Sequence, residues 1–161
     1  MVSIHVAYTQ SINPAGASPV VTEAQVWKGL ERKVRYAQEF VGAISSTDVL
    51  EERDGGKEVV RIAHFKPGYG GEKGSAKETV RSFEPTKVDF IRENGAVITN
   101  TISHGESLTD TDLNMTYTFE YRDIDPAKEV EMRKTYLEGA KSAVDSSIKA
   151  IREMVKDGRI K

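Results

Sequence analysis

The sequence predicts an α+β fold in which a seven-stranded antiparallel sheet wraps around one long C-terminal helix, with two short helices after the first strand. From residue 44 to residue 122 apolar and polar residues alternate, which is the two-residue period of half-buried strands. After Asp125-Pro126 the period changes to three or four residues and holds until Gly158, which is typical of one amphipathic helix. A sheet curved around a single helix tends to enclose a cavity. This order of elements therefore predicts a protein that binds something small and mostly apolar.

The first strand is expected at residues 4–9, where apolar and polar residues alternate, and Asn13-Pro14 ends it. A helix follows with a capping box, because Thr22 stands three residues before Gln25 and each side chain can bond the other's backbone N–H. The apolar face of this helix holds Trp27, Leu30 and Val34. Residues 36–41 predict a second short helical piece.

Six further strands are expected, joined by turns rich in Gly, Pro, Asn and Asp. They are residues 44–53, 57–66, 76–84, 86–93, 96–104 and 111–122. Asn94-Gly95 is the strongest hairpin signal among the turns. One face of the last strand is apolar and is expected to face the interior: Leu113, Met115, Tyr117, Phe119 and Tyr121.

The final helix is expected to begin with Asp125 as N-cap and Pro126 in its first turn, and to end at Gly158. Its predicted apolar stripe is Tyr136, Leu137, Ala140, Val144, Ile148, Ile151 and Val155. The middle of the helix carries small residues, namely Gly139, Ala140, Ala143 and Ser147. Either they leave room under the helix and form the roof of a cavity, or they only allow the helix to approach the sheet closely.

Composition narrows the function classes. Lys and Arg number 23 against 25 Asp and Glu, with the signs interspersed, so no basic surface for nucleic acid is expected. The chain has no Cys, which excludes disulfides and thiolate chemistry. The start lacks a secretory pattern and no apolar run approaches membrane-spanning length. We therefore expect one cytoplasmic domain over residues 1–161 with no membrane span, whose oligomeric state stays open.

Three motifs that suggest chemistry are weak here. The glycines of residues 68–74 lie between two strands, whereas a phosphate loop needs the N-terminus of a following helix. His5, His64 and His104 fall on separate strands, so a three-histidine metal site is not expected. A Gly-x-Ser-x-Gly nucleophile motif is absent. The sequence predicts neither a metal nor a cofactor, and it assigns no catalytic residue.

Polar residues inside the strands are the candidates for a site. Arg61 and Glu78 fall near the middle of two hairpin-connected strands, where they either form a surface ion pair or point inward as a desolvated pair. Asn100 shares its strand face with apolar residues and is either a satisfied core amide or a ligand contact. The predicted ligand-binding residues are Arg61, Glu78, Asn100, His104, Met115, Tyr117, Phe119, Tyr136 and Ala140.

The block Thr22-Glu23-Ala24-Gln25-Val26-Trp27-Lys28-Gly29-Leu30 and the closing residues 151–158, together with Ile12-Asn13-Pro14, Arg61, Glu78 and residues 112–120, resemble the AtaL-like family. This family is a branch of the START-like (SRPBCC) superfamily, whose best-known relative is the birch-pollen allergen. The resemblance covers nearly the whole chain and implies the helix-grip fold with a deep apolar cavity between sheet and long helix. It implies no activity, although some fungal members are associated with secondary-metabolite clusters. The glycine-rich residues 67–74 are longer than the usual turn.

Two function classes follow. The first is a binder or carrier of a hydrophobic small molecule such as a polyketide, an aromatic metabolite or a lipid. The second is an enzyme acting in the same cavity, such as a cyclase, dehydratase or isomerase that uses Glu78, His104 or a tyrosine as acid or base. The two classes differ in whether titratable groups converge on one pocket.

Overall fold

The computed structural model describes residues 1–161 and confirms the predicted fold class. The strands are β1 (Val2–Ser11), β2 (Ile44–Arg53), β3 (Glu58–Phe65), β4 (Ser75–Phe83), β5 (Lys87–Arg92), β6 (Val97–His104) and β7 (Leu113–Ile124). The helices are α1 (Glu23–Arg35) and α2 (Glu129–Lys156), with short 3-10 turns at η1 (Ala37–Glu39), η2 (Asp54–Gly56) and η3 (Pro126–Lys128).

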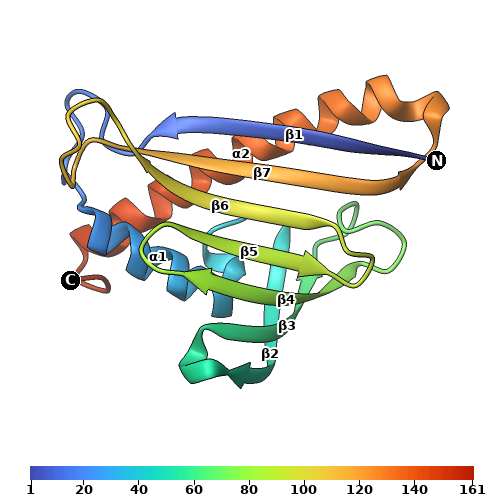
Figure 1. Ribbon diagram of the computed structural model, residues 1–161, viewed down its shortest axis with the longest axis horizontal. Coiled ribbons are helices and arrows are strands. Elements are labelled where there is room, and N and C mark those ends of the chain that lie inside the picture. Colours follow the sequence, from blue (N-terminus) through green and yellow to red (C-terminus); the bar gives the residue numbers. More distant parts are fainter.

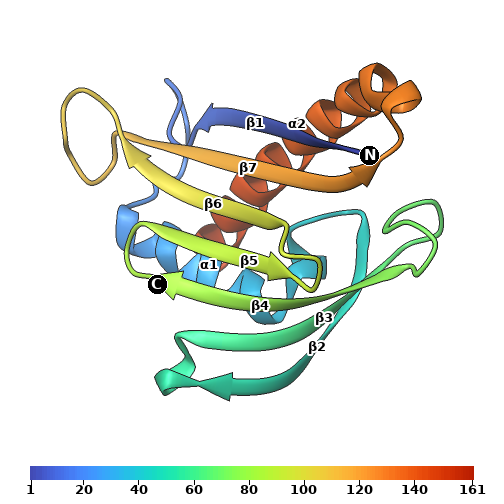
Figure 2. The ribbon, with the colours of Figure 1, turned by 45° about the vertical axis from the view of Figure 1, so that its right-hand side comes forward.

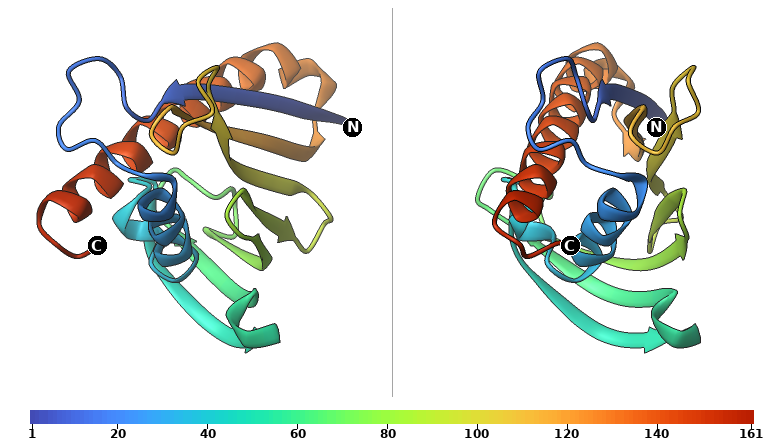
Figure 3. Two further views of the ribbon diagram at one scale, coloured as in Figure 1. Left: turned by 60° about the vertical axis from the view of Figure 1, so that its left-hand side comes forward. Right: turned by 90° about the vertical axis from the view of Figure 1, so that its left-hand side faces the viewer.

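The seven strands form one antiparallel sheet in the order β1-β7-β6-β5-β4-β3-β2. Every strand except β1 lies beside its neighbour in sequence, and β1 joins the far edge next to β7 (Figures 1 and 2). Figure 3 shows both helices on the same concave side of the curved sheet. Side chains from this concave face and from the two helices form the main core, a cluster of 22 buried residues.

Helix α1 begins as its sequence predicts. The Thr22 hydroxyl accepts from the backbone N–H of Gln25 at 3.3 Å, and the Gln25 side chain accepts from the backbone N–H of Thr22 at 2.9 Å. Val21 and Val26, on either side of this cap, are both fully buried in the main core. The cap and the buried valines fix where the helix starts and which face it turns inward.

Helix α2 differs from the prediction in its first turn and in its stripe. Asp125 caps a 3-10 turn, with its carboxylate accepting from the N–H of Ala127 at 3.0 Å, and the α-helix begins only at Glu129. Leu137 is 43% exposed, which corrects its assignment to the buried stripe. Helix α1 packs on the C-terminal half of α2, where Gly29 approaches Ile151 (Figure 3). The buried positions of α2 are Ala140, Ala143, Val144, Ser147, Ile148, Ile151 and Met154.

Candidate functional site

The strand register brings polar side chains together on the concave face. Arg61 on β3 pairs with Glu78 on β4, and Glu78 pairs with Arg92 on β5. Asn100 on β6 pairs with Tyr117 on β7. Cross-strand partners lie on the same face of a sheet, so each row presents its side chains to the interior together.

Arg61 and Glu78 point inward. Their exposures are 3% and 4%, and the Glu78 Oε1 accepts from the Arg61 Nη2 at 2.9 Å and from its Nε at 3.2 Å. The Arg92 Nε lies 3.8 Å from the other carboxylate oxygen of Glu78. The inward arrangement is therefore the one observed, and it places one carboxylate between two guanidinium groups in a water-poor interior.

Arg61 also holds the end of helix α1. Its Nη1 donates to the backbone carbonyls of Lys33 at 3.0 Å and Val34 at 2.8 Å. The last carbonyls of a helix have no partner within the helix and carry partial negative charge, so a guanidinium satisfies them well. One side chain thus joins β3, β4 and α1.

Lys33 turns into the interior from the last turn of α1, and it was not among the predicted site residues. Its exposure is 6%, and its Nζ donates to the Asn100 Oδ1 at 2.5 Å. The ammonium lies 4.3 Å from the ring centre of Tyr117 and 5.1 Å from that of Phe90. Burial, together with the nearby charge of Arg61, lowers the pKa of Lys33 to about 7, while Glu78 acts against both.

Four buried polar atoms in this region have no hydrogen-bond partner. They are Asn100 Nδ2, Tyr117 Oη, Ser147 Oγ and Arg92 Nε. Buried polar groups in proteins are almost always paired, so each of these unpaired atoms calls for an explanation. Burial raises the pKa of the Tyr117 phenol, and an interaction of this hydroxyl with that of Ser147 offsets part of the rise. The two hydroxyls are therefore neighbours, although they do not meet the distance and angle of a normal hydrogen bond. Together with the residues described above, the residues that carry these four unpaired atoms form a set of seven that we call the polar cluster: Lys33, Arg61, Glu78, Arg92, Asn100, Tyr117 and Ser147.

A half-buried row of aromatic rings connects the polar cluster to the surface. The rings of Phe119 and Tyr121 stack with centroids 6.1 Å apart, and Tyr121 stacks on Tyr136 of α2 at 3.6 Å. The Arg92 Cζ lies 5.9 Å from the centre of the Tyr121 ring. Burial raises the pKa of Tyr121 to about 12, so its hydroxyl stays protonated near neutral pH. These rings therefore lie between the polar cluster and solvent, and they present mostly apolar surface with two tyrosine hydroxyls.

The remaining predicted site residues are not members of the polar cluster. Met115 is fully buried in the main core with Tyr117, and Ala140, Ile4 and Val6 form a small cluster that packs against the aromatic row. His104 is exposed, with its Nε2 2.7 Å from the Glu23 carboxylate and its Nδ1 3.2 Å from a loop carbonyl. The structure therefore unites Arg61, Glu78, Asn100 and Tyr117 but not these three.

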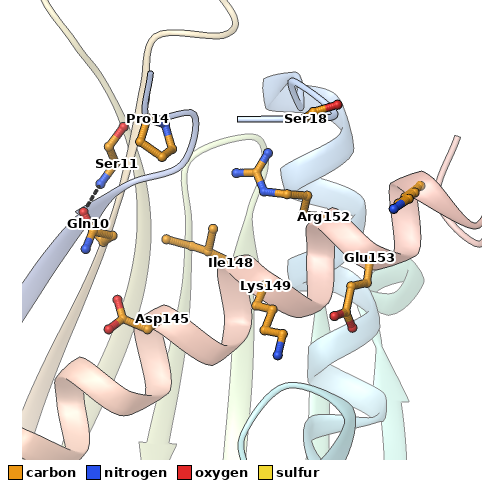
Figure 4. Close-up of a pocket in the computed structure, with 10 residues that line it drawn as sticks. Gln10, Ser11, Pro14, Ser18, Asp145, Ile148, Lys149, Arg152 and Glu153 are labelled. Carbon is orange, nitrogen blue, oxygen red and sulfur yellow. Dashed lines mark hydrogen bonds between the residues drawn. The ribbon is translucent and has the colours of Figure 1, made fainter. Parts of the chain in front are cut away.

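Two surface pockets have linings of mixed polar and apolar character. One, of about 540 Å³, lies between the outer face of α2 and the segment after β1, and Ile148 is its single apolar residue (Figure 4). There Arg152 donates to the carbonyls of Ile12 and Pro19 and ties this segment to α2. The other, of about 460 Å³, lies over the outer side of β1, β7 and β6 and includes Arg133. Neither pocket includes a residue of the polar cluster.

None of the helices combines the length and apolar character needed to cross a membrane.

The structure resembles several solved proteins at low sequence identity. The solution structure of the KanY protein matches with a TM-score of 0.66 and 16% identity over 97% of this chain and 99% of that one. The Zhui aromatase/cyclase from Streptomyces sp. R1128 matches with a TM-score of 0.61 and 15% identity, over 96% and 94% of the two chains. TTHA0849 from Thermus thermophilus matches with a TM-score of 0.61 and 12% identity, over 98% and 99%. At these identities the likeness establishes the shared helix-grip fold.

No curated protein sequence matches this chain. A family match spans residues 6–158, nearly the whole chain, and the family is described as acetylaranotin biosynthesis cluster protein L. The protein therefore belongs to the AtaL family.

Proposed function

We propose that this protein binds an apolar small molecule that carries carbonyl or hydroxyl groups, in the interior between the sheet and α2. The observation that carries the proposal is the set of unpaired buried polar atoms on Asn100, Tyr117 and Ser147. These atoms sit among apolar side chains, as the few orienting groups of a small-molecule site do. A ligand oxygen placed among them would satisfy donors and acceptors that the protein itself leaves free.

The aromatic row of Phe119, Tyr121 and Tyr136 marks the side from which such a ligand would enter. These rings are only partly buried, whereas Phe90 and Tyr117, whose rings lie beside the Lys33 ammonium, belong to the main core. Flat aromatic surfaces favour flat, unsaturated ligands through stacking. Membership in a family described by a biosynthesis cluster, and the fold shared with an aromatase/cyclase, are in keeping with a metabolite of this kind.

A matched pair of ligands tests the proposal. 2-Acetylnaphthalene and 2-isopropylnaphthalene have nearly the same shape, but only the first carries an oxygen. By calorimetry we expect the ketone to bind about fivefold more tightly, since one well-placed hydrogen bond contributes about 1 kcal/mol. Tyr117→Phe should reduce this preference, because it removes one unpaired hydroxyl and leaves the ring.

Tyr8→Phe is the matched control. Tyr8 pairs with Tyr117 across β1 and β7, but its hydroxyl is already engaged by Lys141 at 3.1 Å near the surface. We expect this variant to keep the preference for the ketone. Equal binding of the two naphthalenes by the wild type, or the same loss in both tyrosine variants, would show that the polar cluster does not recognise the ligand.

A further inference from the structure

We propose that Lys33 is a nucleophilic amine that condenses with a carbonyl group of the bound molecule to form an imine. The inference rests on the proposed function, because it needs a ligand in the interior, and it narrows that ligand to an aldehyde or a ketone. It assigns Lys33 a covalent role in addition to its contact with Asn100.

The placement of Lys33 is unusual for a lysine near the end of a helix. Such side chains normally extend to the surface, as Lys28 of the same helix does when its Nζ reaches the terminal carbonyl of Lys161. Lys33 instead occupies the position three residues after Leu30 on the buried face, in contact with two aromatic rings. A methionine would fill comparable space without the penalty of burying a charge. The amine itself is therefore the feature that needs an explanation.

The surroundings of the Lys33 amine leave it free to react. An ammonium can donate three hydrogen bonds, but the Lys33 Nζ makes only the one to Asn100. That bond and the rings of Tyr117 and Phe90 hold the nitrogen in one place. Unpaired polar atoms of Asn100, Tyr117 and Ser147 lie in the same region, where a carbonyl oxygen can be received.

The charges around Lys33 favour its neutral form, which is the nucleophile. Burial disfavours the ammonium most, the cationic Arg61 on β3 acts in the same direction, and the Glu78 carboxylate on β4, which Arg61 and Arg92 both approach, opposes them. Desolvation and a neighbouring cation are the two means by which proteins activate lysine amines. With a pKa of about 7, a substantial fraction of Lys33 is neutral near neutral pH.

The reaction needs no oxidant or cofactor. The Lys33 nitrogen attacks the carbonyl carbon, so a C–N bond forms as the C–O π bond breaks, and one amine proton passes to the carbonyl oxygen to give a carbinolamine. The hydroxyl then leaves as water together with the second amine proton, which breaks the C–O bond and leaves an imine. Tyr117 remains protonated because burial raises its pKa, so its hydroxyl can donate a hydrogen bond to the carbonyl oxygen during the attack.

A 1,3-diketone tests this inference. 1-Phenyl-1,3-butanedione condenses with a neutral amine, loses one water, and then shifts a proton from its central carbon to give a stable enaminone that absorbs in the near ultraviolet. We expect one adduct per chain, with the mass of the diketone less one water, located at Lys33 by peptide mass spectrometry. We expect labelling of Lys33 at neutral pH to be at least about tenfold faster than labelling of Lys28, because a lowered pKa increases the neutral fraction.

Variants and a binding measurement separate the possible failures. Lys33→Met should abolish the adduct, while Lys28→Met should leave it unchanged. Site mapping in the wild type needs no variant, so the test stands even if Lys33→Met folds poorly. If calorimetry shows the diketone bound but Lys33 stays unmodified, the imine inference is wrong and the proposed function survives. If neither the diketone nor 2-acetylnaphthalene binds and no adduct forms, both are wrong.

Discussion

The two halves of helix α2 meet very different surroundings. In residues 143–154, which we call the closed end, five side chains are buried in the main core: Ala143, Val144, Ile148, Ile151 and Met154. Helix α1 comes so close there that a Cβ on Gly29 would lie 2.5 Å from the Ile151 side chain. In residues 129–139, the open end, Met132 and Tyr136 are only partly buried and Val130 is 86% exposed. A Cβ on Gly139 would meet no atom within 4 Å.

This difference means that the closed end of α2 contributes mainly to stability, whereas the open end is the side from which a ligand could reach the interior. Dense packing resists any change in side-chain volume, so the closed end fixes α1 and with it Lys33. The open end contributes the partly buried side chains of Met132 and Tyr136, which can shift without disturbing the main core. The one residue of the polar cluster on α2, Ser147, belongs to the closed end. The following four changes test the contrast between the two ends.

Arg61→Ala should have the largest effect. It leaves the Glu78 carboxylate buried without its main partner and frees two helix-end carbonyls, so we expect the free energy of unfolding to fall by about 3 to 5 kcal/mol. Urea denaturation measures this. Arg53→Ala is the control, since Arg53 bonds two glutamates on the exposed edge of the sheet and should lose little. Similar losses in both variants would mean that burial of the pair is unimportant.

Lys33→Met should remove a pH dependence. The unfolded chain keeps the Lys33 proton up to about pH 10.5, whereas the folded protein releases it at about pH 7. Between these values the unfolded state binds more protons, so the wild type should become more stable by on the order of 2 kcal/mol from pH 7 to 9. Met cannot titrate, and the variant should lose this rise. If the free energy of unfolding changes with pH in the same way in both proteins, the Lys33 amine is exposed to water.

Gly29→Ala probes the closed end. Alanine favours the helix by about 1 kcal/mol over glycine, but overpacking against Ile151 costs about 1 to 3 kcal/mol. We expect a net loss of about 1 kcal/mol by thermal or urea unfolding. The double variant Gly29→Ala with Ile151→Val should recover part of it, since valine removes one of the clashing carbons. A stabilised single variant would show that the contact between α1 and α2 is loose.

Gly139→Ala probes the open end and should have the smallest effect. Its added methyl meets nothing, so helix propensity acts alone and stability should rise by up to about 1 kcal/mol. Affinity for 2-acetylnaphthalene should stay the same, because the methyl points away from the interior. A loss of stability here would contradict the exposed position of this turn.

The sequence was most informative where local chemistry decides the structure. The Thr22 and Gln25 capping box, the hairpin turns and the period change after Asp125 each depend on a few neighbouring residues, and the elements that they predict are present. The pairing of Arg61 with Glu78 also followed from a hairpin, although only burial in the folded chain shows which face they occupy.

Lys33, Arg92 and Ser147 were missed for separate physical reasons. Lys33 stands seven residues after Val26 and three after Leu30 on the apolar face of α1, a signal that could have been used. A lysine at the margin of such a face usually extends to water, which hides this signal. Arg92 comes next to Glu78 only because of the register between β4 and β5. Ser147 faces the interior only because of how α2 is rotated about its axis, which its small polar side chain does not indicate. His104 is predicted to bind the ligand, but its side chain is exposed and contacts the Glu23 carboxylate.

The contact of Arg61 with the carbonyls of Lys33 and Val34 also affects how the molecule fluctuates. A helix end held only by its own backbone frays, and its amide protons exchange with solvent quickly. Here the last turn of α1 can unwind only if the guanidinium also releases it, and that guanidinium is anchored to β3 and β4. We therefore expect the amide protons of this turn to exchange as slowly as those of the central strands, so that α1 and the sheet unfold as one cooperative unit.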